Sequence, residues 1–275
     1  MRVDRVTSRD GAGIAVYSVG SGPGIVILHG GGVSERDYHR LAHAWSDRFT
    51  VHLYNRRGRP DSAPLTGTET AGTDLDDLAA VLEHTGARNI FGHSGGGFVA
   101  MRAGLSLPLD RIAVYDPAVS IDDHLRMTVL DRVDEAVRRG DTARAVTLFG
   151  EQSYAGEPVA KLPFGLRLLI TKAFLRTPIG RRLAELLPTI PPELRRIDAH
   201  HGPATDYAGI TADVLLAYGS RSQRYFGRIC EALADAIPRA RAVAIPRSAH
   251  NAANIARPGF VRPFATFFAE SLTPA

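Results

Sequence analysis

Short apolar, β-branched runs recur along the first part of the chain and alternate with segments of helical periodicity. Residues 24–28 contain the continuous run Ile-Val-Ile-Leu, which is typical of a strand buried on both faces of a sheet. Further strand-like runs occupy residues 3–8, 14–19, 49–54, 89–91 and 111–115. Asp10 and Gly11 lie between the first two of these runs, and this dipeptide favours a hairpin turn.

Helix-like segments at residues 38–46, 70–85 and 95–105 separate these strand-like runs. Within the second segment, Leu75, Leu78, Ala79 and Leu82 are spaced to share one face of a helix. Strands that alternate with helices in this way predict an α/β fold, with a parallel sheet built from right-handed crossovers.

The alternation stops between residues 120 and 207, where the sequence is helical in pattern, rich in arginine and interrupted by prolines. It resumes with strand-like runs at 214–218 and 242–245 and helix-like segments at 225–236 and 258–270. A helical block inserted between two β/α halves favours a cap over the carboxyl ends of the strands, where open α/β sheets bind ligands. We therefore predict a core domain of residues 1–119 and 208–275, and a helical cap (lid) of residues 120–207.

Composition narrows the class of protein. The 275 residues are 44% hydrophobic and 23% charged, as in an ordinary globular protein, and the net charge of +4 comes from scattered arginines that give little support to nucleic-acid binding. Cys230 is the only cysteine, which excludes an intrachain disulfide and a cysteine-rich metal site. The charged N-terminus lacks the apolar run of a signal peptide, and the most apolar stretch, residues 166–174, is too short to span a bilayer. We expect a cytoplasmic monomer or homodimer with a small-molecule substrate and no membrane partner.

The sequence Gly-His-Ser-Gly-Gly at residues 92–96 carries the first sign of chemistry. It fits the pattern G-x-S-x-G and lies between a short apolar strand and a helix, which is the context that a nucleophile elbow requires. The tight turn between strand and helix needs small flanking residues and holds the Ser94 hydroxyl above the edge of the sheet. There the N-terminus of the helix favours developing negative charge.

With this motif in place, the chain resembles the serine-nucleophile branch of the α/β-hydrolase superfamily over almost its whole length apart from the cap. His-Gly-Gly-Gly at residues 29–32 directly follows the apolar strand run that ends at residue 28, and it is similar to the oxyanion loop of that family. The resemblance implies a mostly parallel, twisted sheet of about eight strands with helices on both faces. It also implies an oxyanion hole formed by the amides of Gly31 and Gly95.

Four other residues are expected to contact the substrate. His29 and Gly30 belong to the oxyanion loop, His93 is the variable residue of the elbow, and Phe164 is one of the apolar cap residues that could line a pocket. The turn at residues 56–62, Arg-Arg-Gly-Arg-Pro-Asp-Ser, has proline where the family usually has its second glycine, and we interpret it as structural.

His250 is the predicted general base. It follows the last strand-like run by a short loop, which is where the superfamily places its catalytic histidine. A serine hydroxyl is a poor nucleophile at neutral pH, so a positioned imidazole must accept its proton.

The third member of the triad is less obvious from the sequence. In many family members the acid follows the strand after the cap, but here Ser222 occupies that position. A second solution in the superfamily puts the acid after the strand that follows the nucleophile helix, and Asp116 lies there. Asp116 is therefore the predicted acid, with Asp122 or Asp123 as weaker substitutes.

These residues predict acyl transfer through an acyl-enzyme on Ser94, with an ester, lactone or related carbonyl compound of a small, largely apolar metabolite as substrate. This chemistry needs no metal and no cofactor. The same fold also supports lyases, cyclases and cofactor-free oxygenases that use the histidine as a base, as well as non-catalytic proteins that bind a small ligand.

Overall fold

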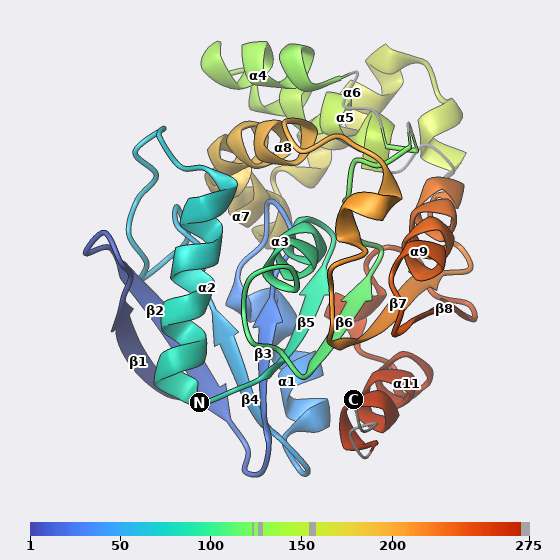
Figure 1. Cartoon of the computed structure of the whole chain (residues 1–275). Helices are drawn as coiled ribbons and strands as arrows, with labels where there is room; N and C mark the ends of the chain where they lie inside the picture. The colour runs from blue at the N-terminus through green and yellow to red at the C-terminus, as the bar shows by residue number, and fades with distance from the viewer. Residues whose placement is uncertain (123, 126–128, 154–157, 271–275) are drawn as a thin grey trace.

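A central eight-stranded sheet organises the computed structural model, which describes residues 1–122, 124–125, 129–153 and 158–270 (Figure 1). Its strand order is β1-β2-β4-β3-β5-β6-β7-β8. The strands are β1 (Arg2–Thr7), β2 (Gly13–Val19), β3 (Gly24–Leu28), β4 (Thr50–Tyr54), β5 (Asn89–His93), β6 (Arg111–Tyr115), β7 (Asp213–Gly219) and β8 (Ala240–Ile245). Strand β2 is antiparallel to both β1 and β4, and every later pair is parallel. The predicted mostly parallel sheet is confirmed.

Helices cover both faces of this sheet, because successive strand residues point to opposite sides. One face packs against α2 (Ala71–Thr85), α3 (Gly95–Ala103) and α9 (Arg224–Ala236), and the other against α1 (His39–Trp45), α10 (Ala252–Ile255) and α11 (Pro258–Ala269). In β3, Val26 and Leu28 belong to the first core, whereas Ile25 and Ile27 belong to the second. The apolar run is therefore buried on both faces, as predicted.

The face of α2 that packs on the sheet carries predicted apolar residues. Leu78 is fully buried, and Leu75 and Leu82, which are half-buried, pack against the same core. The helix also buries the carboxylates of Asp74 and Asp77. Both carboxylates form ion pairs with buried arginines, so burial of their charge is compensated.

Between β6 and β7 the chain forms a layer of helices at the end of the sheet where the parallel strands finish (Figure 1). We refer to this layer as the cap. Its elements are α4 (Leu130–Arg138), α5 (Thr142–Ser153), η2 (Pro158–Lys161), α6 (Phe164–Phe174), α7 (Pro178–Leu186), η3 (Leu187–Thr189) and α8 (Ile190–Asp198). Two further short 3-10 helices are η1 (Glu35–Tyr38), before α1, and η4 (Ala204–Tyr207), before β7.

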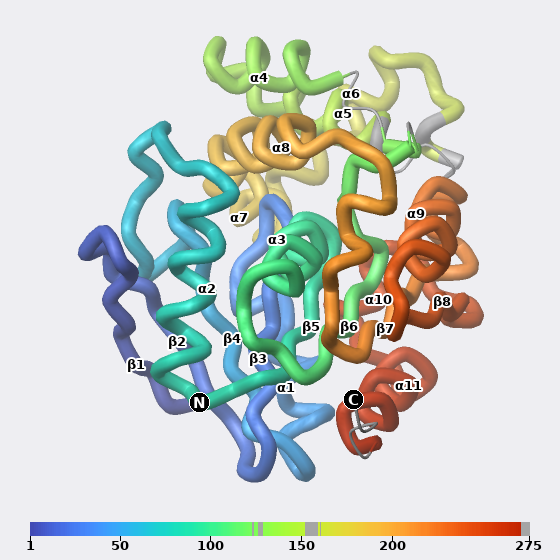
Figure 2. The backbone as a smooth tube through the Cα atoms, viewed as in Figure 1, coloured from blue at the N-terminus to red at the C-terminus, as the bar shows by residue number. Residues whose placement is uncertain are grey.

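The chain enters and leaves the cap at adjacent points (Figure 2). Ile121 and Gly202 form an isolated parallel bridge. The Gly202 amide donates to the Ser120 carbonyl at 3.3 Å, and the Asp122 amide donates to the Gly202 carbonyl at 3.2 Å. The two segments that join the cap to the sheet, one entering and one leaving it, are therefore hydrogen-bonded to each other.

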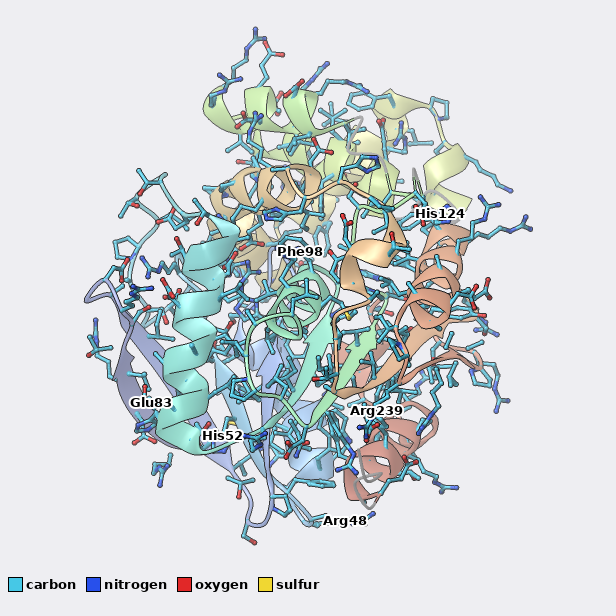
Figure 3. All side chains as sticks on the ribbon, in the orientation of Figure 1. Arg48, His52, Glu83, Phe98, His124 and Arg239 are labelled. Atoms are coloured by element: carbon cyan, nitrogen blue, oxygen red, sulfur yellow. The ribbon has the colours of Figure 1, made fainter. Side chains whose placement is uncertain are left out.

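Charged side chains lie mainly on the outside of the molecule, as the exposed Arg48 and Glu83 do in Figure 3, while Phe98 of α3 is buried. None of the helices in the described part of the chain is both long and apolar enough to cross a bilayer.

Candidate active site

Ser94 lies on a sharp turn between β5 and α3. Its φ of 53° is in the left-handed region that side chains rarely adopt, and it immediately precedes the first residue of α3. A Cβ atom on Gly92 would lie 2.6 Å from the Gly96 carbonyl oxygen, and one on Gly96 would overlap the carbonyls of Leu28 and His29. Both glycines are therefore required by close backbone approach, which is the nucleophile-elbow geometry that the sequence predicted.

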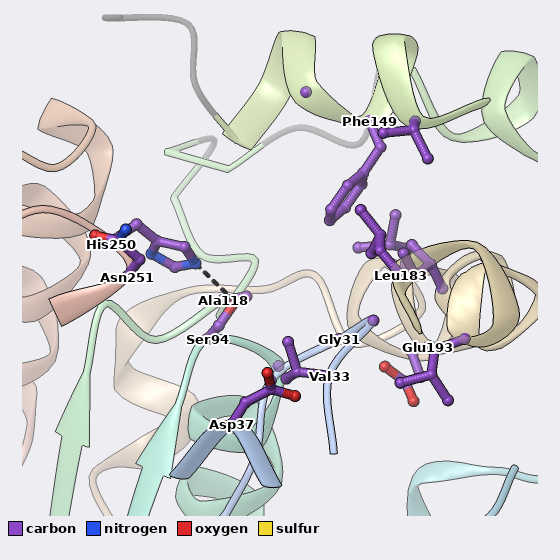
Figure 4. A pocket seen from close by; sticks show the side chains of 18 of the residues that line it. Gly31, Val33, Asp37, Ser94, Ala118, Phe149, Leu183, Glu193, His250 and Asn251 are labelled. Carbon is purple, nitrogen blue, oxygen red and sulfur yellow. Dashed lines mark hydrogen bonds between the residues drawn. The ribbon is translucent and has the colours of Figure 1, made fainter. Parts of the chain in front are cut away.

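The structure brings the three predicted catalytic side chains together in one hydrogen-bonded chain, of which Figure 4 shows the contact between His250 and Ser94. His250 Nε2 lies 3.2 Å from Ser94 Oγ, and His250 Nδ1 lies 3.0 Å from Asp116 Oδ2. The carboxylate of Asp116 is fully buried and also accepts hydrogen bonds from the Ser222 hydroxyl at 2.6 Å and the Gly219 amide at 3.0 Å. Since a carboxylate only accepts, His250 Nδ1 carries the proton and Nε2 is free to accept one from Ser94.

Of the carboxylates considered from the sequence, Asp116 is the one that contacts His250. It directly follows β6, next to the strand that carries Ser94. Asp122 is exposed at the start of the cap, and Asp123 lies outside the described residues. Ser222 occupies the position expected for an acid and instead donates to Asp116. The loop after β7 thus supports the carboxylate rather than supplying it.

Three aromatic residues hold the ring and loop of His250. Phe226 stacks on the imidazole with ring centres 4.9 Å apart and an interplanar angle of 8°, and His93 lies 4.8 Å away. The Tyr115 hydroxyl donates to the carbonyl of Ala249 at 2.8 Å. Sequence reasoning missed Phe226 and Tyr115 in this role, because neither belongs to a local motif.

Tyr38 connects the oxyanion loop to the histidine loop. Its hydroxyl accepts from the Gly30 amide at 3.0 Å and lies 2.6 Å from His93 Nδ1. The His250 carbonyl can only accept, so His93 Nε2–H donates to it at 2.9 Å, and His93 Nδ1 is left to accept from the Tyr38 hydroxyl. Burial lowers the pKa of His93 well below its usual value, and nearby His250 lowers it further, so this ring stays neutral. Tyr38 was also missed from the sequence.

The predicted oxyanion amides lie close to each other. Gly95 is the first residue of α3, so its amide has no carbonyl partner within that helix. A Cβ atom on Gly95 would lie 3.7 Å from the Gly31 nitrogen, so the two residues are neighbours beside Ser94. His29 braces this loop: its Nδ1 donates to the Gly30 carbonyl at 2.8 Å, and its Nε2 accepts from the Arg56 amide at 3.1 Å.

A buried ionic cluster connects the cap to the core behind this loop. Glu193 of α8 lies 3.5 Å from Arg56 and forms a close ion pair with Arg59, while Arg196 of α8 contacts Asp74 of α2 at 2.9 Å. Arg56 also contacts Asp74 at 3.1 Å. Burial alone raises the pKa of Glu193, but Arg56 and Arg59 outweigh this effect and lower it to about 2. Glu193 is therefore ionised and holds α8 to the turn after β4.

Ser94 opens into a cavity of about 600 Å³ between the sheet edge and the cap (Figure 4). This volume suits a small organic ligand. Its walls are mainly apolar side chains of the cap, among them Phe149, Ile170, Phe174, Leu183, Ile190 and Leu194. Among the described residues, no group of three or more His, Cys, Asp or Glu side chains is placed to hold a metal ion.

Two of the four predicted substrate-contacting residues line this cavity, namely Gly30 and His93. The other two, His29 and Phe164, do not line it. His29 is fully buried beneath the oxyanion loop, where both ring nitrogens bond to backbone groups. Phe164 packs among cap residues, with the guanidinium groups of Arg144 and Arg167 each 5.4 Å from its ring centre.

This chain is similar to solved structures over almost its whole length and to curated proteins over part of it. A methyl ester esterase of Aeromonas hydrophila, acting on pimeloyl-[acyl-carrier protein], is 33% identical over 97 residues, which are 34% of this chain and 37% of that protein. An alpha/beta hydrolase from Sphaerobacter thermophilus has a TM-score of 0.81 at 26% identity, covering 97% of this chain and 100% of the other. The enol-lactonase from Burkholderia xenovorans shares the fold, with a TM-score of 0.74 at 19% identity over 97% and 100% of the two chains.

The curated relatives match only in part, since the aligned segments span 40% or less of those proteins' lengths. The model of the "Alpha/beta hydrolase family", in contrast, matches residues 25–263, from β3 to α11.

Proposed function

Because this chain belongs to the alpha/beta hydrolase family, we propose that it is a serine hydrolase that cleaves an ester or lactone of a small, largely apolar compound through an acyl-enzyme on Ser94. The observation that carries the proposal is the continuous hydrogen-bonded chain from Ser94 through His250 to Asp116. The names of similar proteins, an esterase and an enol-lactonase among them, agree with this class of substrate.

The geometry supports the following acylation step. Ser94 Oγ attacks the substrate carbonyl carbon while its proton passes to His250 Nε2, 3.2 Å away. The carbonyl oxygen becomes negative and accepts hydrogen bonds from the amides of Gly31 and Gly95, which stabilise the tetrahedral intermediate. When the intermediate collapses, the bond to the leaving oxygen breaks, and His250 gives its proton to that oxygen. Asp116 stabilises the imidazolium that exists between these two events.

Deacylation repeats this sequence with water. His250 takes a proton from a water molecule as its oxygen attacks the acyl carbon, and then returns a proton to Ser94 Oγ as the acid leaves. The carboxylate of Asp116 stays in the same position throughout, because the Ser222 hydroxyl and the Gly219 amide donate hydrogen bonds to it. Tyr38 and Phe226 are positioning residues in this step: Tyr38 holds the oxyanion loop through Gly30, and Phe226 stacks on the ring of His250.

The cavity supports an apolar substrate. Its walls are mainly apolar on the cap side, while Ser94, His93 and His250 line it at the sheet edge, which favours a carbonyl group placed toward the nucleophile.

A fluorophosphonate probe tests the proposal, because it reacts only with an activated serine. We expect the purified protein to be labelled at Ser94, as located by peptide mass spectrometry, and Ser94→Ala and His250→Ala to abolish the labelling. Asp116→Asn should slow it by about 10⁴-fold, since the imidazole then loses the partner that fixes its tautomer. Exposed residues provide matched controls: Ser106→Ala and His43→Ala should label as the parent does.

A folded protein that is not labelled would refute the acyl-enzyme. A protein that converts a carbonyl substrate equally well after Ser94→Ala would instead use His250 as a base alone, as a lyase or cofactor-free oxygenase does.

A further inference from the structure

Large apolar side chains are exposed on one side of the cap. Helix α6 contains no buried residue, although its sequence is strongly apolar. Leu166, Leu169, Ile170 and Phe174 follow the spacing of a helical stripe, and Ile179 extends it onto α7. Leu169 and Ile179 are each more than 60% exposed. We refer to these five residues as the α6–α7 patch.

The same segment is strongly basic. Residues 158–184 contain six basic residues and no aspartate or glutamate, and the single carboxylate of α6 and α7 is Glu185, near the end of α7. Five of these are exposed around the patch: Lys161, Lys172, Arg176, Arg181 and Arg182. An exposed apolar stripe with basic residues beside it is the pattern of a helix that lies on an anionic lipid surface.

The α6–α7 patch is also continuous with the cavity. Ile170, Phe174 and Ile179 line the cavity that reaches Ser94 and are at the same time exposed to solvent. The patch therefore forms part of the rim of the cavity mouth. Figure 2 shows α6 in the helical layer, away from the sheet and from both chain termini.

We propose that the α6–α7 patch docks on an anionic lipid surface, and that ester amphiphiles enter the cavity from that surface. The apolar side chains insert between lipids while the basic residues contact the negative headgroups. Docking on the surface needs no spanning helix, so it replaces the expectation of no membrane partner. The route for the substrate rests on the proposed function, whereas the docking itself does not.

Charge decides between a lipid surface and a second copy of this chain as the occupant. A symmetric dimer through the patch would bring the basic residues of both copies face to face. Like charges at such an interface oppose association, whereas an anionic surface neutralises them. The cationic rim thus favours the lipid surface.

Vesicle sedimentation of the purified full chain tests the docking. We expect binding to vesicles of mixed phosphatidylcholine and phosphatidylglycerol, much weaker binding to phosphatidylcholine alone, and loss of binding at high salt. The double variant Leu166→Ser/Leu169→Ser, whose residues do not line the cavity, should bind at least about tenfold more weakly. The same variant should hydrolyse a short, water-soluble ester as the parent does.

Two further variants separate the contributions. Lys172→Gln/Arg176→Gln removes two exposed charges and should weaken binding only to the anionic vesicles. Val3→Ser changes an apolar residue that is 58% exposed on the edge strand β1, far from the cap, and should leave binding unchanged.

Failure of the docking and failure of the proposed function give different results. Ser94 labelling without any vesicle binding would overturn the docking, and so would a dimer that Leu166→Ser/Leu169→Ser converts to monomer in light scattering. Vesicle binding without Ser94 labelling would support the docking and overturn the acyl-enzyme.

Discussion

Glu193→Gln should destabilise the protein strongly, because it removes one of two carboxylates that neutralise three buried arginines between cap and core. The surrounding arginines lower the pKa of Glu193 from 4.5 to about 2. At about 1.4 kcal/mol per pKa unit, this shift corresponds to about 3 kcal/mol of stabilisation when the group is ionised. Removal of one partner from a buried ion pair typically costs about 3–5 kcal/mol, which agrees. Glutamine keeps the volume, so the effect isolates the charge.

Urea unfolding near neutral pH measures this cost, and thermal unfolding should show a midpoint lower by about 5 °C for a chain of this length. Glu185→Gln on α7 is the matched control, because the same change at an exposed carboxylate should stay within about 0.5 kcal/mol of the parent. A Glu193→Gln variant as stable as the control would show that the cluster does not hold the cap to the core.

The pH dependence gives a second check on the same charge. The folded state depresses the pKa of Glu193, so its contribution is complete above the unfolded value of 4.5 and is lost as the pH falls toward about 2. The stability difference between the parent and Glu193→Gln should therefore shrink across this window. A difference that stays constant there would mean that the substitution acts through packing.

Three other substitutions test the site. Gly96→Ala should lower the midpoint of thermal unfolding severely, because its Cβ would overlap the carbonyls of Leu28 and His29. Gly165→Ala, with open space around it, should not, and equal midpoints for the two variants would contradict this reasoning. Asp116→Ala/Ser222→Asp should label with fluorophosphonate faster than Asp116→Ala alone, since the side chain of residue 222 already reaches the position of the carboxylate; equal rates would exclude transfer of the acid. Tyr38→Phe should lower kcat about 10–100-fold with little change in KM, and an unchanged kcat would show that the link between the two loops is dispensable.

The strands and helices of the core follow closely from the sequence because their signals are local. The apolar run at 24–28 and the run at 111–115 coincide with β3 and β6, and an unbroken apolar strand is readable without knowledge of its neighbours. The burial of Asp74 and Asp77 on α2 was not predictable from the sequence, because they pair with arginines from the turn after β4. Such pairing depends on tertiary contacts that periodicity does not contain.

The site likewise contains residues that local motifs predict and residues that only the fold brings in. Ser94 and the oxyanion glycines belong to compact motifs, so their positions were predictable from residue order. Tyr38 and Phe226 reach the site from elements far away in the chain and carry no motif of their own. Glu193 likewise looks like an ordinary helix residue until the fold places two arginines against it.

The hydrogen-bonded crossing at Ile121 and Gly202 makes the cap an exchangeable module. Since the two ends of the insertion lie side by side, a helical layer of another length or shape can be grafted between them without altering the order or register of any strand. Ser94, His250 and Asp116, the proposed catalytic residues, all lie outside the graft, so selection on substrate preference can proceed independently of selection on the reaction. A new cap must also supply a negative charge for Arg56 and Arg59, because their partner Glu193 belongs to α8 and leaves with the old cap.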